Sequence, residues 1–583
     1  MGLKLRATVV VLLGLVLYII KKCYCLPGES CWPTHEQWAS LNATLRGGLI
    51  KSYPLGSACH EPQYNVTRCT EIREAWEWPE IHINSPTSVM NPYFQLAGID
   101  PCDPFLASHI ICDVHDHVQL AVNATSAQSV ITGLAFAREH HIRIVVKNTG
   151  HEYMGKSAPG RGTLTIWTHH MSSISPVLEY QSPYYNGSAM RLGAGVMGAA
   201  AMEAAHEAGL HIVGGFCPSV GIAGGYIQGG GHGPLSSAYG LAADQVLEWE
   251  VITADGRHLV ASPTDHHELY WALAGGGGGT FAVVICVTVR AFPDNEVVGG
   301  ASLVIERGLQ PSTDAYWAAV GAWQEILPAL LGKGATAGYA VTRDAFFVQP
   351  ITILGAGSES EMRVILHPFV ARLDEMNVKY QLRTTAFASF YEHYQTYQGP
   401  LPWGPYVVNL LFGGRMISRH ALETRPSELL ATVRHIVEDT QAFLGFVALD
   451  VNPMRADGGL RAAPISTNAV LPSWRRAALT VLAQSTWNLS APRRDGLRRS
   501  REMTEAVVPA LANLTKGEPA MGTYMNEADF GLREWKKDFF GENWAALQEA
   551  KDNWDADGLF WAPKSVGSDR WVLDREGKLC MEG

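Results

Sequence analysis

Two glycine-rich stretches decide how this chain folds: KNTGHEYMGKSAPGRG at residues 147–162 and GGFCPSVGIAGGYIQGGGHG at residues 214–233. Glycine at this density lets the backbone come close to a ligand and aim several N–H groups at an anion such as a pyrophosphate. Neither stretch has the GxGxxG pattern of a Rossmann fold or the GxxxxGKS/T pattern of a phosphate loop. The pair favours a dinucleotide site on another kind of α/β platform, although glycine content alone fits tight structural turns equally well.

The segments around these stretches predict helices alternating with strands. Apolar residues at Val130, Ile131, Leu134 and Ala135 recur at helical spacing, and Asp255-Gly256 is a strong hairpin turn. Helices are predicted at residues 126–141 and 196–208 and after Pro263, ending at the glycine run 275–279. Strands are predicted at residues 142–147, 163–168, 247–253, 258–261 and 281–289.

Composition excludes several classes of protein. The chain has 583 residues, of which 47% are hydrophobic and 17% charged, so a disordered chain, a coiled coil and a collagen are excluded. The length predicts two or more domains, or one large elaborated domain. The net charge is −11 and no Lys/Arg cluster is present, so nucleic-acid binding through phosphate charge is not expected.

The first residues have the pattern of a secretion signal. Lys4 and Arg6 precede an apolar run at residues 7–20, which is shorter than the ~20 residues that a membrane-spanning helix needs. Lys21 and Lys22 follow the run and leave an uncleaved anchor as the alternative. No later segment predicts a membrane span. Glycosylation sequons support the secretory pathway, with a secreted or lumenal product; they lie at Asn42, Asn65, Asn123, Asn186, Asn488 and Asn513.

Cysteines are concentrated near the N-terminus. The chain has 10 Cys, and the spacings Cys25/Cys31, Cys59/Cys69 and Cys102/Cys112 suit local disulfides, although sequence does not fix connectivity. The region 26–113 is also rich in Pro and aromatic residues and is expected to be a loop region pinned by disulfides. No set of His or Cys has the spacing of a metal site, so no metal is predicted. A GxSxG hydrolase motif is absent as well.

Several motifs together carry a family resemblance. KNTGH, CPSVG, GGGHG, LEWEVITADG, WALAGGGGGTF and NEADF…NWDADGLFWAPKSVGSDRW occur in this order over residues 25–580. In this combination the chain resembles the FAD-linked oxidases, and specifically the berberine-bridge-enzyme-like group of the vanillyl-alcohol-oxidase (PCMH-type) superfamily. The segment CLPGESCWP resembles the secreted fungal members.

The resemblance implies an α/β (α+β) fold and a division of the chain. A PCMH-type FAD-binding domain of two subdomains is expected at residues 114–297, after a signal peptide at 1–25 and the N-terminal region at 26–113. A substrate domain with a mixed sheet capped by helices is expected at 298–515. The segment 516–583 is expected to return to the FAD domain.

The resemblance also implies a bicovalently attached FAD. His151 of KNTGH would bond to the flavin 8α carbon, and Cys217 of CPSVG would make a second bond through sulfur. Imidazole and thiolate are the nucleophiles suited to this. The alternatives are a loop histidine bonded to backbone and a small buried thiol. Further cofactor-binding residues are expected at Lys147, Asn148, Thr149, Gly150, Val220, Gly221, Gly224, Gly225, Gly229 and Gly230.

Three other positions bear on the chemistry that the resemblance implies. Tyr524 is the candidate base, with a core tyrosine as the alternative, and Asn526 is a weaker candidate for the flavin pocket. Val220 would flank the path of O₂ to the flavin. Tyr226 stands where plant members carry a His, so the role of that His is not transferred.

The implied function is FAD-dependent oxidation. A small-molecule substrate with an alcohol or amine carbon would give a hydride to the flavin, and O₂ would take up the electrons to give H₂O₂. A role in fungal secondary-metabolite biosynthesis, of the alkaloid or polyketide type, is expected. The alternatives are a secreted carbohydrate or simple-alcohol oxidase, a dehydrogenase with another electron acceptor, and a flavin-loaded binding protein with little turnover. The oligomeric state is not predicted.

Overall fold

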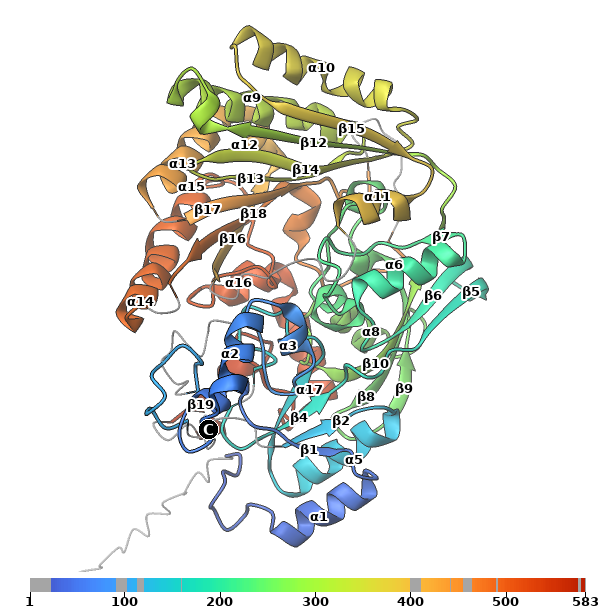
Figure 1. Ribbon diagram of the computed structural model, residues 1–583. Coiled ribbons are helices and arrows are strands. Elements are labelled where there is room, and N and C mark those ends of the chain that lie inside the picture. The colour runs from blue at the N-terminus through green and yellow to red at the C-terminus, as the bar shows by residue number, and fades with distance from the viewer. Residues whose placement is uncertain are drawn as a thin grey trace, which may run out of the picture.

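The computed structural model of the chain has two lobes, which lie one above the other in Figure 1. It describes residues 23–90, 102–112, 120–158, 160–398, 410–440, 442–454, 464–488, 491–574 and 578–581. The predicted secretion signal therefore lies almost entirely outside the described residues.

The lower lobe contains a small sheet with the strand order β1-β2-β4-β3. Strands β2 (Leu120–Asn123), β4 (Thr163–Trp167) and β3 (Arg143–Lys147) are parallel, and β1 (Leu49–Lys51) is antiparallel to β2. Helix α5 (Ala127–Glu139) packs on the sheet through buried Val130 and Leu134 and begins after an N-capping serine, Ser126. The helix and the two strands predicted here are confirmed.

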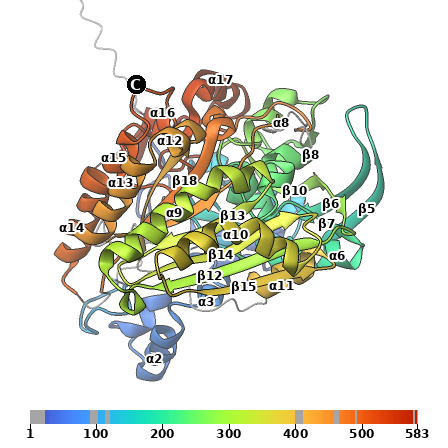
Figure 2. The ribbon, with the colours of Figure 1, turned by 90° about the horizontal axis from the view of Figure 1, so that it is seen from above.

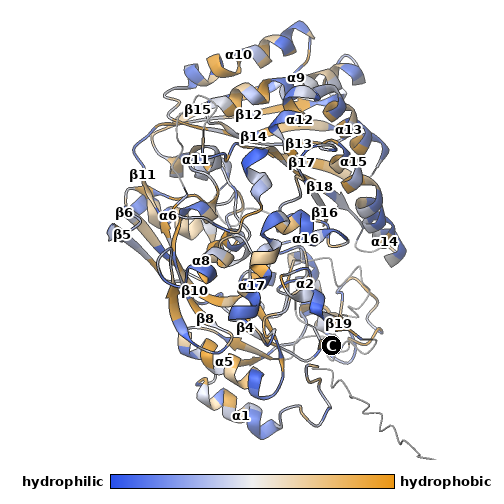
Figure 3. Ribbon diagram, turned by 180° about the vertical axis from the view of Figure 1, so that it is seen from behind, coloured by the Kyte–Doolittle hydropathy of each residue, from blue (hydrophilic) through white to orange (hydrophobic). Residues whose placement is uncertain are grey.

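A second sheet in the same lobe has five antiparallel strands in the order β5-β6-β10-β8-β9. Its central strand β10 (Ala282–Arg290) is buried along its whole length and is mostly hydrophobic (Figure 3). The predicted hairpin and both predicted helices are confirmed. The other strands of this sheet are β5 (Ile174–Gln181), β6 (Asn186–Gly193), β8 (Val246–Thr253) and β9 (His258–Ala261). The two helices are α6 (Gly198–Glu207) and α8 (His267–Leu273).

The upper lobe is built on a seven-stranded sheet with the order β15-β12-β14-β13-β17-β18-β16. Every described strand pair in it is antiparallel, so the expectation of a mixed sheet was wrong. Its strands are β12 (Val298–Glu306), β13 (Thr336–Val341), β14 (Ala345–Leu354), β15 (Gln381–Phe387), β16 (Leu410–Ser418), β17 (Ala442–Ala448) and β18 (Ala477–Thr486).

Helices cover the face of this sheet that points away from the lower lobe (Figures 1 and 2). They include α9 (Thr313–Gly332), α10 (Glu359–Glu375) and α13 (Pro426–Asp439). The opposite face turns toward the lower lobe. There Phe412 of β16 stacks on Tyr153, with ring centroids 3.8 Å apart, so the sheet reaches the first glycine-rich loop.

The N-terminal region was expected to be loops, and this prediction was wrong in part. It contains α1 (His35–Thr44), α2 (Val66–Ala75) and α3 (Pro79–Ile83). Helices α1 and α2 begin after N-capping Thr34 and Asn65 and bury few residues, so they show no apolar periodicity to detect. The three predicted disulfides, Cys25–Cys31, Cys59–Cys69 and Cys102–Cys112, are present.

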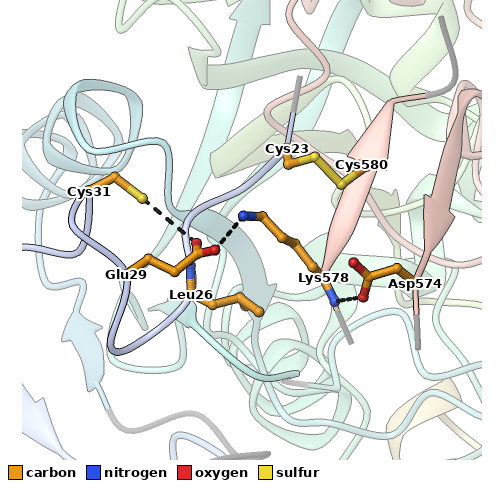
Figure 4. The surroundings of a disulfide bond; sticks show 7 residues. All are labelled: Cys23, Leu26, Glu29, Cys31, Asp574, Lys578 and Cys580. Carbon is orange, nitrogen blue, oxygen red and sulfur yellow. Dashed lines mark hydrogen bonds and ion pairs between the residues drawn. A yellow bond between two sulfur atoms is a disulfide. The ribbon is translucent and has the colours of Figure 1, made fainter. Parts of the chain in front are cut away.

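A fourth disulfide, Cys23–Cys580, joins the two ends of the described chain (Figure 4). Beside it Lys578 pairs with Glu29, and Tyr24 stacks on Trp571 with ring centroids 4.9 Å apart. The disulfide closes a loop of 557 residues. It ties the C-terminal segment, with β19 (Trp571–Leu573) and β20 (Leu579–Met581), to the N-terminal region.

Within the described part of the chain, no helix has both the length and the apolar character needed to cross a membrane.

The end-to-end disulfide Cys23–Cys580 is expected to stabilise the protein more than a local one does. Removing a disulfide typically costs about 2–5 kcal/mol, and the cost rises with the length of the loop it closes. The double variant Cys23→Ser/Cys580→Ser should therefore unfold at a lower temperature than Cys25→Ser/Cys31→Ser, which opens a loop of 6 residues. Scanning calorimetry under oxidising conditions measures both. Equal unfolding temperatures for the two double variants would contradict the prediction.

Candidate functional site

A cavity lies between the two glycine-rich loops, strand β10 and the C-terminal segment. Most of the predicted cofactor-binding residues line it, whereas Lys147, Gly229 and Gly230 do not. The predicted residues among its lining are Asn148, Thr149, Gly150, His151, Cys217, Val220, Gly221, Gly224, Gly225, Tyr524 and Asn526.

The first loop is held from behind by the N-terminal region. Lys147 ends β3 and is buried, and its Nζ donates to the carbonyl oxygens of His82 and Asn148, both at 3.3 Å. Burial lowers the pKa of Lys147 to about 7. Gly150 has φ +86°, and a Cβ there would lie 3.3 Å from the carbonyl oxygen of Ser88. Lys147 therefore supports the loop from behind and does not line the cavity, whereas Gly150 lines it.

The two loops touch where a side chain has no room. A Cβ on Gly221 would lie 2.0 Å from Nδ2 of Asn148, and that Nδ2 already donates to the carbonyl oxygen of Ala194 at 2.6 Å. The amide of Gly221 also donates to Oγ1 of Thr149 at 3.3 Å. This contact places His151, which follows Thr149, next to Ser219, which precedes Gly221.

His151 and Cys217 meet at one hydroxyl group, that of Ser219. Its Oγ lies 2.8 Å from Nε2 of His151 and 3.5 Å from Sγ of Cys217. Burial, with the nearby His82 and Lys147, lowers the pKa of His151 to about 3, so its imidazole is neutral. Burial raises the pKa of the Cys217 thiol, while hydrogen bonds from Ser219 and Val220 oppose that rise. Cys217 is not part of a disulfide.

The C-terminal segment supplies the opposite wall of the cavity. Nδ2 of Asn526 lies 2.7 Å from the carbonyl oxygen of Gly225 and 2.8 Å from the hydroxyl of Tyr524. Oε1 of Glu527 lies 3.1 Å from Nε2 of His232. The side chain of Glu527 is 22% exposed and that of His232 is 6% exposed.

Burial sets the protonation state of two tyrosines at the cavity. It raises the pKa of Tyr524, and the charge of Glu527 adds to this rise. Burial likewise raises the pKa of Tyr226 well above its ordinary value, and the Tyr226 hydroxyl donates to the carbonyl oxygen of His232 at 3.2 Å. Both phenols are therefore protonated at neutral pH.

Sequence reasoning missed Ser219, His232 and Glu527. Each lies inside a motif that was noticed, CPSVG, GGGHG and NEADF respectively. The motifs marked these segments as important for the site. They could not show that the side chains of His232 and Glu527, which are 295 positions apart in the chain, lie in contact.

The cavity fits a polar, extended ligand such as FAD. Three buried polar atoms that line it have no hydrogen-bond partner among the described residues: Asn148 Oδ1, Gln228 Oε1 and His232 Nδ1. Such atoms are expected to meet polar groups of a ligand or water. Next to them the backbones of Gly225 and Gly278 approach closely, since a Cβ on Gly278 would lie 3.1 Å from the Gly225 Cα. Residues of both loops could hold the cofactor through backbone N–H groups.

Comparisons with known proteins agree with this site. Residues 118–262 match the FAD binding domain family, and residues 523–567 match the family described as berberine and berberine like. The FAD-linked oxidoreductase ZEB1 of Gibberella zeae is 38% identical over 559 residues, which are 96% of this chain and 95% of that protein. The bifunctional decalin synthase calF of Penicillium decumbens is 35% identical over 566 residues, with the same coverage.

The crystal structure of the VAO-type flavoprotein MtVAO615 from Myceliophthora thermophila C1 superposes with a TM-score of 0.88 at 37% identity and covers 96% of this chain and 100% of that one. Identity at this level over nearly the full length of both relatives leaves one assignment. The chain belongs to the berberine-bridge-enzyme-like group of the vanillyl-alcohol-oxidase (PCMH-type) flavoproteins and is an FAD-linked oxidoreductase.

Proposed function

We propose that the protein is an oxidase that converts a small-molecule alcohol to a carbonyl compound and carries FAD bonded to His151 and Cys217. The observation that carries the proposal is a cavity with His151 and Cys217 on one wall and Glu527 and Tyr524 on the other. When bound, FAD accepts a hydride from the alcohol carbon and passes the electrons to O₂, which yields H₂O₂.

Glu527 is the residue best suited to take the hydroxyl proton. Its carboxylate lines the cavity, is partly exposed and is held by His232 at 3.1 Å. Glu152 also lines the cavity, but it accepts hydrogen bonds from the backbone N–H groups of Met154 and Ser157, at 2.8 and 3.1 Å. Its oxygens therefore have partners already, and Glu527 is the better candidate.

Tyr524 receives a different role from the one expected of it. A phenol whose pKa is raised by burial does not start as a base. Its hydroxyl, oriented by Asn526, instead donates a hydrogen bond to the substrate oxygen in our proposal. An amine substrate fits this wall less well, because the Glu527 carboxylate would favour the protonated ammonium form, which cannot release a hydride.

We further propose that the reaction serves secondary-metabolite biosynthesis in a fungus. A relative named as a decalin synthase supports this. Four disulfides and exposed sequon residues, among them Asn65, Asn186 and Asn513, support passage through the secretory pathway. Glycopeptide mapping of the native protein tests the passage, and unmodified asparagines at all three positions would speak against it.

The proposed attachment predicts separate effects of the two loop residues. His151→Ala should lose the bond to the 8α carbon, and Cys217→Ala should leave FAD attached once. Mass spectrometry of flavin-bearing peptides measures both. Cys286→Ala is the matched control, because Cys286 is a second free cysteine that is buried in β10 and does not line the cavity. Wild-type protein that releases all its FAD on acid precipitation would refute the attachment.

The proposed proton acceptor predicts a loss of rate without a loss of cofactor. Glu527→Gln keeps the shape of the side chain and should lower kcat by about 10²–10⁴-fold, the usual contribution of a general base. The substrate is the alcohol that reacts fastest in a panel of benzylic, aliphatic and sugar alcohols. The rate is measured as H₂O₂ formation. Glu505→Gln, which removes an exposed carboxylate outside the cavity, should keep the wild-type rate. Unchanged turnover in Glu527→Gln would exclude this role.

The position of Val220 predicts a selective effect on oxygen. Val220 lines the cavity three residues after Cys217, and a leucine there would fill space that O₂ needs to reach the flavin. Val220→Leu should slow reoxidation of the reduced enzyme by O₂ far more than reduction by substrate. Stopped-flow spectra of the two half-reactions separate these effects. Equal slowing of both would instead indicate a general packing defect.

A further inference from the structure

The Ser219 side chain contacts both proposed attachment residues. Ser219 is 1% exposed, and its Oγ lies 2.8 Å from Nε2 of His151 and 3.5 Å from Sγ of Cys217. A hydroxyl group has one proton to donate and lone pairs to accept with. The directions of the two hydrogen bonds are therefore linked.

The surroundings of Cys217 determine these directions. Hydrogen bonds with the Ser219 hydroxyl and with the backbone of Ser219 and Val220 oppose the rise that burial causes in the pKa of Cys217, and therefore favour its thiolate. A thiolate sulfur has no proton to donate, so when the thiolate forms, the Ser219 hydroxyl 3.5 Å away is the donor. Ser219 must then accept from Nε2–H of His151. A neutral imidazole has one N–H, so the lone pair of His151 lies on Nδ1.

Backbone contacts hold Ser219 in this place. The amides of Gly198 and Ala199, at the start of α6, donate to the carbonyl oxygens of Val220 and Pro218, both at 2.9 Å. Neither bond involves the Ser219 side chain. Removing the hydroxyl should therefore leave the path of the loop intact.

We propose that Ser219 is a positioning residue for covalent attachment of FAD: it leaves Nδ1 of His151 as the nucleophile and stabilises the thiolate of Cys217. The proposal rests on the attachment proposed above and adds the group that directs it. Ser219 does not itself bond to the cofactor.

The two attachment steps balance with O₂ as the oxidant. His151 forms an Nδ1–C bond at the 8α carbon, where a C–H bond breaks, and its Nε2 proton leaves through Ser219. Cys217 forms an S–C bond to the ring, where another C–H bond breaks, and gives up its thiol proton. Each bond releases two electrons and two protons, which reduce one O₂ to one H₂O₂.

The variants Ser219→Ala and Ser219→Thr test the proposal in the full-length secreted protein. Ser219→Ala should lower the share of flavin bonded to Cys217 by about tenfold, the usual effect of losing a hydrogen bond to a charged group. It should also yield a mixture of Nδ1 and Nε2 linkages at His151. Ser219→Thr keeps a hydroxyl and should retain both features of the wild type. Mass spectrometry of flavin peptides gives the first quantity and NMR spectroscopy of the isolated peptide the second.

Ser236→Ala is the matched control. Ser236 is a buried serine near the second loop whose Oγ accepts from the amide of Gly233 at 2.9 Å and lies outside the cavity lining. It should attach FAD as the wild type does.

Three results would count against the inference or its basis, and they are distinguishable. Ser219→Ala with wild-type stoichiometry and linkage overturns the role of Ser219. Wild-type protein linked through Nε2 overturns it as well, and this result decides the question if Ser219→Ala does not fold. Wild-type protein without covalent flavin refutes the attachment itself.

Discussion

The contact between the two glycine-rich loops is the constraint on which the rest of the site depends. At Gly221 the loops approach so closely that a Cβ would lie 2.0 Å from the Asn148 amide nitrogen. That amide cannot move away freely, because it donates to the carbonyl oxygen of Ala194. An alanine at position 221 would therefore push the loops apart. His151 and Cys217 would then no longer reach the same hydroxyl, although neither residue had been changed.

Other long-range contacts hold the remaining walls of the cavity to this pair of loops. Buried Lys551 joins the C-terminal segment to the glycine run of the lower lobe, since its Nζ donates to the carbonyl oxygens of Thr280 and Phe560 and pairs with Asp555, each at 2.6 Å. Arg475 of the upper lobe makes a paired contact with buried Asp244 of the lower lobe at 2.6 and 2.7 Å. A charge left unpaired inside the protein is costly, so each of these contacts resists separation of the parts it joins.

The sequence predicted what local patterns encode and missed what distant residues build. Strands of the lower lobe and the three short-range disulfides were foreseen, because periodicity and close Cys spacing are local signals. The Cys23–Cys580 disulfide was not foreseen, because nothing near Cys580 marks its partner. The Glu527–His232 pair was missed for the same reason. Tyr524 lines the cavity as foreseen, and its role as a base stays a prediction; the burial and the Glu527 charge that raise its pKa follow only from the fold.

Burial therefore determines which of the cavity residues are uncharged at neutral pH. It keeps the imidazole of His151 neutral, and it keeps the phenols of Tyr524 and Tyr226 protonated. Tyr226 consequently brings no charge to the cavity. Lys156, whose pKa burial lowers to about 8, is the lysine that lines the cavity. In our proposal the substrate proton is taken by Glu527, whose carboxylate remains partly exposed and lies 3.1 Å from Nε2 of His232.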